Sequence, residues 1–109
     1  MEFPHTDGLS ASQLTQFKVL QQRFVAGLPA RWLEIQNAET PQARQVALHR
    51  LSGSAGGYGF EGLHQRAKDA ELLSSGLDGV AWTRAVTLLK AEIELACTML
   101  QARTLSDLE

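Results

Sequence analysis

The chain has 109 residues, of which 44% are hydrophobic and 20% are charged, with a formal net charge of −2 at pH 7. This length suits one domain, and the apolar content is enough to fill a core, which argues against general disorder. Lys and Arg are scattered along the chain and are outnumbered by Asp and Glu, so composition gives no support to a nucleic-acid-binding surface.

The first predicted helix begins at Ser10, which can form a capping box with Gln13. Apolar residues then recur at three- and four-residue steps, as one buried helical face requires: Leu14, Phe17, Leu20, Phe24, Val25 and Leu28. Gly27 and Pro29 interrupt this pattern. They predict a break in the helix, followed by a short second helix around Trp32.

Thr40 and Pro41 predict the start of a third helix, because a capping hydroxyl is followed by a proline whose missing N–H costs nothing. This helix should end near the glycines that follow position 55. A fourth helix is expected over roughly 60–75, with Gly76 as its C-cap. Asp78 is expected to cap the last helix, whose apolar positions advance by four and three: Trp82, Val86, Leu89, Ile93, Ala96 and Leu100.

Together these elements predict an all-α fold, an antiparallel four-helix bundle with a short additional helix. The bundle is expected over residues 10–103, between an N-terminal tail at 1–9 and a polar, frayed C-terminal tail at 104–109. Cys97 has no partner for an internal disulfide, and neither a secretory signal nor a membrane-length apolar stretch is present. We therefore expect a cytoplasmic protein that does not enter a membrane. We also expect a monomer, because the exposed face is polar and small and one bundle accounts for the apolar stripes.

A helical wheel of the third helix, at about 100° per residue, separates a core face from an exposed face. The core face holds four residues: Ala47, Leu51, Ala55 and Tyr58. His49 lies almost opposite, among small and polar residues: Gln42, Gln45, Ser52, Gly53 and Gly56. Glycine within a helix costs about 1 kcal/mol relative to alanine, so Gly53 and Gly56 suggest a demand other than helix stability. We interpret them as clearing a flat approach for a second protein to reach the imidazole of His49.

An exposed imidazole is well suited to accept a phosphoryl group. It is largely neutral at cellular pH, and its ring nitrogen is then a nucleophile that needs no general base. Phosphoryl transfer mostly requires in-line positioning and charge neutralisation, which a partner can supply with its own metal ion. The chain has no Walker loop, kinase glycine loop or metal-ligand cluster, so we expect a docking protein and not an enzyme.

The residues around His49 carry a family resemblance. His49-Arg50-Leu51-Ser52-Gly53-Ser54-Ala55 is followed at fixed spacing by Gly59, Leu63, Ala67 and Glu71. This pattern resembles the motif of the histidine-containing phosphotransfer (HPt) family, and it covers the two central helices. The Leu28-Pro29 step also resembles the end of the first helix in that family.

This resemblance implies that His49 accepts a phosphoryl group from the aspartate of a response-regulator receiver domain, or from a hybrid sensor histidine kinase, and passes it to another receiver. It implies no cofactor in this chain, with magnesium expected on the partner receiver. Gly53 would leave room for the receiver's active site, and Glu71 would orient the imidazole. The Leu and Ala of the family motif fall on Leu51 and Ala55, which the wheel also places in the core.

One position departs from the family pattern. The family usually has lysine three residues after the histidine, where its ammonium helps to neutralise the phosphate, and this chain has Ser52. The Ser52 hydroxyl brings no charge, and Arg50 is badly placed on the wheel to compensate. Lys68 or Arg66 of the following helix are the candidates to do so. The substitution bears on the lifetime of the phosphohistidine and on the rate of transfer.

Two alternatives stand beside this hypothesis. The chain could be an HPt-like adaptor that binds receivers or kinases without being phosphorylated. Ser52, in place of the usual lysine, would then reflect the loss of efficient phosphorylation. A metal site made of His49, His64 and Glu71 is disfavoured, because no pair of them has the i, i+4 spacing typical of helical sites. His5 and His64 are expected to be ordinary surface residues.

Overall fold

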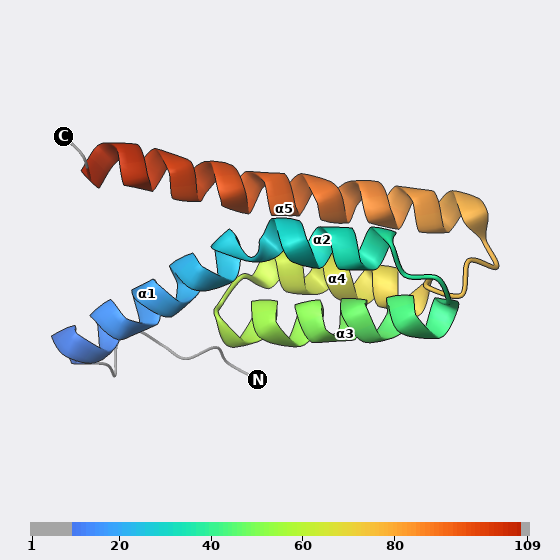
Figure 1. The fold of residues 1–109 in the computed structure, drawn as a ribbon, viewed down its shortest axis with the longest axis horizontal. Helices are drawn as coiled ribbons and strands as arrows, with labels where there is room; N and C mark the ends of the chain where they lie inside the picture. The colour runs from blue at the N-terminus through green and yellow to red at the C-terminus, as the bar shows by residue number, and fades with distance from the viewer. Residues whose placement is uncertain (1–9, 108–109) are drawn as a thin grey trace.

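The computed structural model describes residues 10–107 and places the side chains of residues 10–101. This range contains no strand and is built from five helices: α1 (Ala11–Ala26), α2 (Leu28–Gln36), α3 (Pro41–Gly57), α4 (Glu61–Leu72) and α5 (Gly79–Asp107). The all-α bundle predicted from the sequence is confirmed (Figure 1). The expected N-terminal tail at 1–9, which includes His5, lies outside the described residues.

Helices α2, α3, α4 and α5 form the compact part of the molecule, in which α3 and α4 are an antiparallel pair and α5 runs along the whole length (Figure 1). The short α2 packs against both α3 and α5. Helix α1 diverges from the other helices and contacts them mainly through α5 and α2 (Figure 1). The short second helix is therefore a full member of the bundle, while much of the longer first helix lies outside it.

The divergence of α1 corrects the expectation of one continuous buried face from Leu14 to Leu28. Phe24 and Val25 are buried at the end of α1, but Leu20 is 42% exposed. The break itself occurs where it was predicted, since α1 ends at Ala26 and α2 begins at Leu28. A three- and four-residue spacing shows which residues share a face, but it does not show how far along the helix a neighbour covers that face.

The predicted helix starts agree with the hydrogen bonds in the structure. The Gln13 backbone N–H donates to Ser10 Oγ at 3.1 Å, and the Ser10 N–H donates to Gln13 Oε1 at 2.9 Å, which completes the capping box. Thr40 Oγ1 accepts from the Ala43 N–H at 3.0 Å, and Asp78 Oδ1 accepts from the Ala81 N–H at 3.0 Å. These contacts satisfy backbone donors that a helix leaves unpaired in its first turn.

Two helix ends differ from the prediction. Helix α4 ends at Leu72, three residues before the expected boundary at 75, and its C-cap is Leu73. The expected cap, Gly76, lies instead in the turn that follows, with a φ of +73°. This left-handed conformation suits glycine, which has no Cβ to clash with the backbone. Helix α5 continues to Asp107, into the range 104–109 where a frayed tail was expected.

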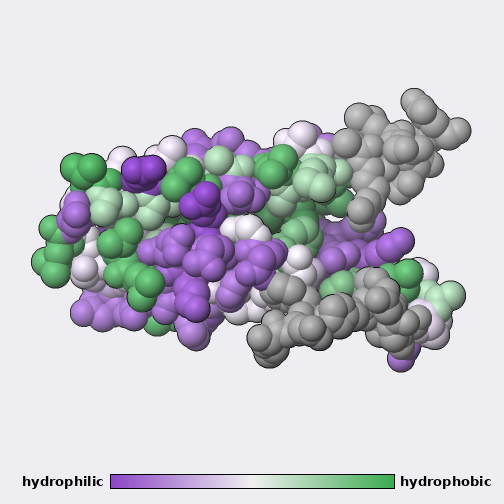
Figure 2. Space-filling model, turned by 180° about the vertical axis from the view of Figure 1, so that it is seen from behind, coloured by the Kyte–Doolittle hydropathy of each residue, from purple (hydrophilic) through white to green (hydrophobic). Residues whose placement is uncertain are grey.

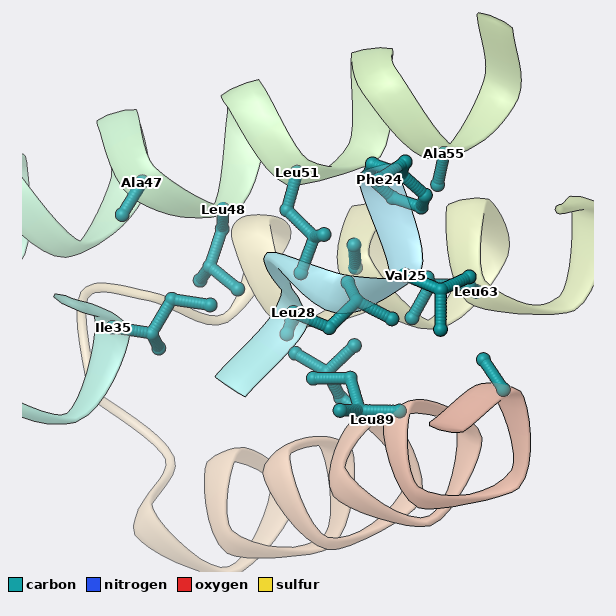
Figure 3. Packing of buried hydrophobic residues seen from close by; sticks show 14 of the residues in the cluster. Phe24, Val25, Leu28, Ile35, Ala47, Leu48, Leu51, Ala55, Leu63 and Leu89 are labelled. Atoms are coloured by element: carbon teal, nitrogen blue, oxygen red, sulfur yellow. The ribbon is translucent and has the colours of Figure 1, made fainter. Parts of the chain in front are cut away.

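The core lies where α2, α3, α4 and α5 meet. Four leucines are fully buried, and they come from three different helices: Leu28, Leu48, Leu51 and Leu89. Their side chains point toward one another between α3 and α5 (Figure 3). Cys97 packs against the edge of this core, and its partial burial raises the pKa of the thiol above its ordinary value. This placement supports a packing role for Cys97.

The surface is not uniformly polar. Large apolar side chains are exposed near the turn from α4 to α5, at 77% for Leu72, 95% for Leu77 and 83% for Val80. Apolar surface gathers at this end of the molecule in the view from behind (left in Figure 2). The core of the bundle therefore does not cover all of the apolar side chains at this end, contrary to the interpretation that one bundle accounts for the apolar stripes. No described helix has both the length and the apolar character needed to cross a membrane.

Candidate functional site

His49 projects from the outer face of α3, with its side chain 77% exposed, and contacts a carboxylate on α4. Its Nδ1 lies 3.2 Å from Glu71 Oε2 and 3.3 Å from Glu71 Oε1. The two helices are joined by a short turn in which Gly59 adopts a φ of +82°. This hairpin brings together two residues that are 22 positions apart in the sequence and that were both named as site residues.

The contact with Glu71 defines what the imidazole can do. An Nδ1–H that donates to a carboxylate fixes the tautomer in which the other ring nitrogen, Nε2, keeps its lone pair. Because Nδ1 faces Glu71, Nε2 lies on the far edge of an exposed ring. The arrangement therefore presents one oriented nucleophilic nitrogen to a reagent outside the protein.

Ser52 and Gly56 do not belong to the exposed face on which the sequence analysis placed them. Ser52 is 6% exposed, and its Oγ lies 3.1 Å from Nδ1 of His64 on α4. The same Nδ1 lies 2.8 Å from the Ser52 carbonyl oxygen, which accepts its hydrogen. Gly56 is also buried, and a Cβ added there would lie 3.1 Å from His64 Nδ1. Both residues are thus part of the α3–α4 interface.

His64 likewise differs from its expectation as an ordinary surface residue, because its ring is partly buried against α3. The physical reason is the close approach of two helices, which requires small residues on the facing side. The wheel took its core face from the apolar residues of α3 and counted the polar residues and glycines outside that face as exposed. The i, i+4 pair of Ser52 and Gly56 opposite a histidine is the signal in the sequence that could have indicated this contact.

Gly53 is placed as predicted, in the open. It follows His49 by one helical turn, and a Cβ added there would meet no atom within 4 Å. Gly57, one turn further, is also exposed and equally open. His49, Gly53 and Gly57 therefore form a stripe at i, i+4 and i+8, in which Gly57 takes the place that the sequence analysis gave to Gly56.

The two candidate cations on α4 lie on different sides of that helix. Lys68 is exposed and lies four residues after His64 and three before Glu71, two α4 residues whose side chains hydrogen-bond to α3. Arg66 instead lines a depression against α5, together with Arg84. On the helical wheel of α4, Lys68 lies about 60° from Glu71, whereas Arg66 lies about 140° away.

Among the described residues, no three His, Cys, Asp or Glu side chains gather closely enough to hold a metal ion. Comparisons of the chain with protein-family models, curated proteins and solved structures found no match. The functional proposal therefore rests on the geometry of the site and on the sequence pattern around His49.

The contrast between Gly53 and Gly56 leads to a prediction about stability. Gly53→Ala should raise the free energy of unfolding by about 0.5–1 kcal/mol, since alanine favours the helix and the new methyl group meets nothing. Gly56→Ala should gain clearly less or lose stability, because its methyl group presses on a ring that is hydrogen-bonded to Ser52. Urea denaturation of the two variants measures this difference, and equal gains would contradict the packing described for His64.

Proposed function

We propose that this chain is an HPt-like phosphocarrier, in which Nε2 of His49 accepts a phosphoryl group from a receiver-domain aspartate or a kinase and delivers it to another receiver. The observation that carries this proposal is the exposed His49 ring, held through Nδ1 by Glu71 and followed by an open glycine stripe. The HPt-like motif around the same histidine supports it independently.

In the proposed transfer, His49 is the only group of this chain at which a covalent bond forms. The Nε2 lone pair forms the N–P bond while the P–O bond of the donor's aspartyl phosphate breaks, and that electron pair leaves with the donor carboxylate. The imidazole gains positive charge in this step. The Glu71 carboxylate, 3.2 Å from Nδ1, stabilises that charge as it develops. The reverse reaction transfers the group to the next receiver.

The open glycine stripe supplies the access that such a transfer needs. The reacting atoms must approach in line and closely, which brings the receiver's surface against α3. Gly53 and Gly57 place no side chain beyond His49 along this path. The magnesium ion that neutralises the phosphoryl group in flight would belong to the receiver, and the chain would act in the cytoplasm without a cofactor of its own.

The experiment is phosphotransfer from a radiolabelled, phosphorylated receiver domain, tested over a panel of receivers. The expected result is label on this chain that is lost in acid and stable in base, as a phosphohistidine is. If the chain is helical and folded but takes up no label from any receiver, the proposal that it is a phosphocarrier is rejected.

Gly53→Leu tests the docking geometry within that assay. We expect transfer from a receiver to slow by about tenfold or more, because a large side chain one turn from His49 blocks close approach. The variant should be no less stable than the native chain, since leucine favours the helix. Ala91→Leu, at an exposed position of α5, is the matched control and should transfer normally. Unchanged transfer by Gly53→Leu would contradict the docking face.

The second candidate is an HPt-like adaptor that binds receivers or kinases without being phosphorylated. The burial of Ser52 favours it, because the position three residues after His49 then offers neither charge nor a free hydroxyl to a phosphate. Binding assays with a receiver distinguish the two. A receiver that binds the native chain and a His49→Ala variant equally well, with no transfer to either, would support the adaptor.

A further inference from the structure

A phosphoryl group on His49 would bring a second negative charge close to the Glu71 carboxylate. It brings a charge of about −1.5 to −2 at pH 7 to an imidazole whose other nitrogen already contacts the Glu71 carboxylate. Like charges at this separation repel, so a cation on the same face would stabilise the phosphorylated state. Ser52 cannot contribute, because it is uncharged and its hydroxyl faces His64 inside the interface.

The arginines near the site are turned away from it or already engaged. Arg44 lies over the Trp82 ring, 4.8 Å from its centroid, and donates to the Ser74 carbonyl oxygen at 3.1 Å. Arg50 follows His49 directly, and the 100° step of the helix carries it away from α4. Arg66 lines the depression against α5.

We propose that Lys68 binds the phosphoryl group on His49 and neutralises part of its charge. Lys68 lies one turn from Glu71, the α4 residue that contacts His49, and its exposed side chain has no ion-pair partner among the described residues. A four-carbon stem with a rotatable ammonium group suits a residue that must reach across to a neighbouring helix. Helix α4 would then supply both the carboxylate that orients the ring and the cation that binds its phosphate. This inference rests on the phosphorylation of His49 proposed above.

The test uses chemical phosphorylation and needs no receiver. Phosphoramidate transfers its phosphoryl group to Nε2 as its P–N bond breaks and ammonia leaves with the electron pair. The resonance of phosphorylated His49, assigned by its absence in His49→Gln, is then titrated by phosphorus NMR. A nearby cation favours the dianion and so lowers the pKa of the phosphoryl group. We expect Lys68→Gln to raise that pKa by about 0.5 unit at low salt and less at high salt.

Two control variants complete the test of Lys68. Lys68→Arg should keep the native phosphoryl pKa, since it keeps the charge, and Arg66→Gln should also leave it unchanged as the matched control on the other side of α4. An unchanged pKa in Lys68→Gln, or an equal change in Arg66→Gln, would overturn the role of Lys68. The absence of any phosphohistidine at position 49 after treatment would overturn it as well. Failure of transfer from receivers, with the phosphoryl pKa still dependent on Lys68, would reject the carrier function and retain the phosphate contact.

Discussion

The His49→Gln variant is expected to take up no acid-labile label from a phosphorylated receiver, while His64→Gln and His5→Gln are expected to become labelled like the native chain. Glutamine is close in size to histidine and can keep a hydrogen bond to Glu71, but its amide nitrogen has no lone pair available for attack on phosphorus. Fold and site geometry should therefore persist while the nucleophile is lost.

The chain has three histidines, so the three variants test every histidine that could carry the phosphoryl group. Nδ1 of His64 lies within hydrogen-bond distance of the carbonyl and hydroxyl oxygens of Ser52, and the ring packs over Gly56. The His64 ring is therefore less exposed than that of His49. The measurement is phosphotransfer with mass-spectrometric assignment of the modified residue, together with circular dichroism to show that each variant is folded. Full labelling of His49→Gln would refute the assignment of the nucleophile and move attention to the other two histidines.

The starts of helices were the part of the fold that the sequence predicted best. Ser10, Thr40 and Asp78 cap helices as expected, because a cap depends on residues within one turn of chain. The path of α1 was not predictable in the same way. Leu20 continues the apolar spacing of its helix, yet it is 42% exposed because α1 becomes buried only after that point, at Phe24 and Val25. Which neighbour covers a face is a property of the tertiary fold.

The site shows the same division between local and tertiary information. The exposure of His49 and Gly53 followed from the wheel, and the nearness of Glu71 was implied by the HPt-like spacing. Ser52 and Gly56 were misplaced because small residues occur both on open faces and where two helices come close. Hydrophobicity alone does not distinguish these two situations, whereas the His64 ring packed on both residues does.

Leu89→Ala is expected to destabilise the fold by about 2–5 kcal/mol, a large share of the roughly 5–15 kcal/mol that holds a domain of this kind folded. Leu89 is fully buried on α5 and lies next to Leu28 at the centre of the core (Figure 3). Removing its side chain loses apolar contact and leaves a cavity that the helices around it fill only in part. Urea denaturation followed by circular dichroism measures the change.

Leu95→Ala is the matched control, since it truncates the same side chain on the same helix at a position that is 54% exposed. Its cost should stay below about 1 kcal/mol, because much of its apolar surface is in water before the change.

At a temperature and urea concentration where Leu89→Ala is still folded, His49 should accept phosphate at the native rate, because His49 and Glu71 lie on α3 and α4. Equal destabilisation by the two variants would contradict the placement of α5 against the core, and a loss of transfer in folded Leu89→Ala would show that α5 helps to hold the site.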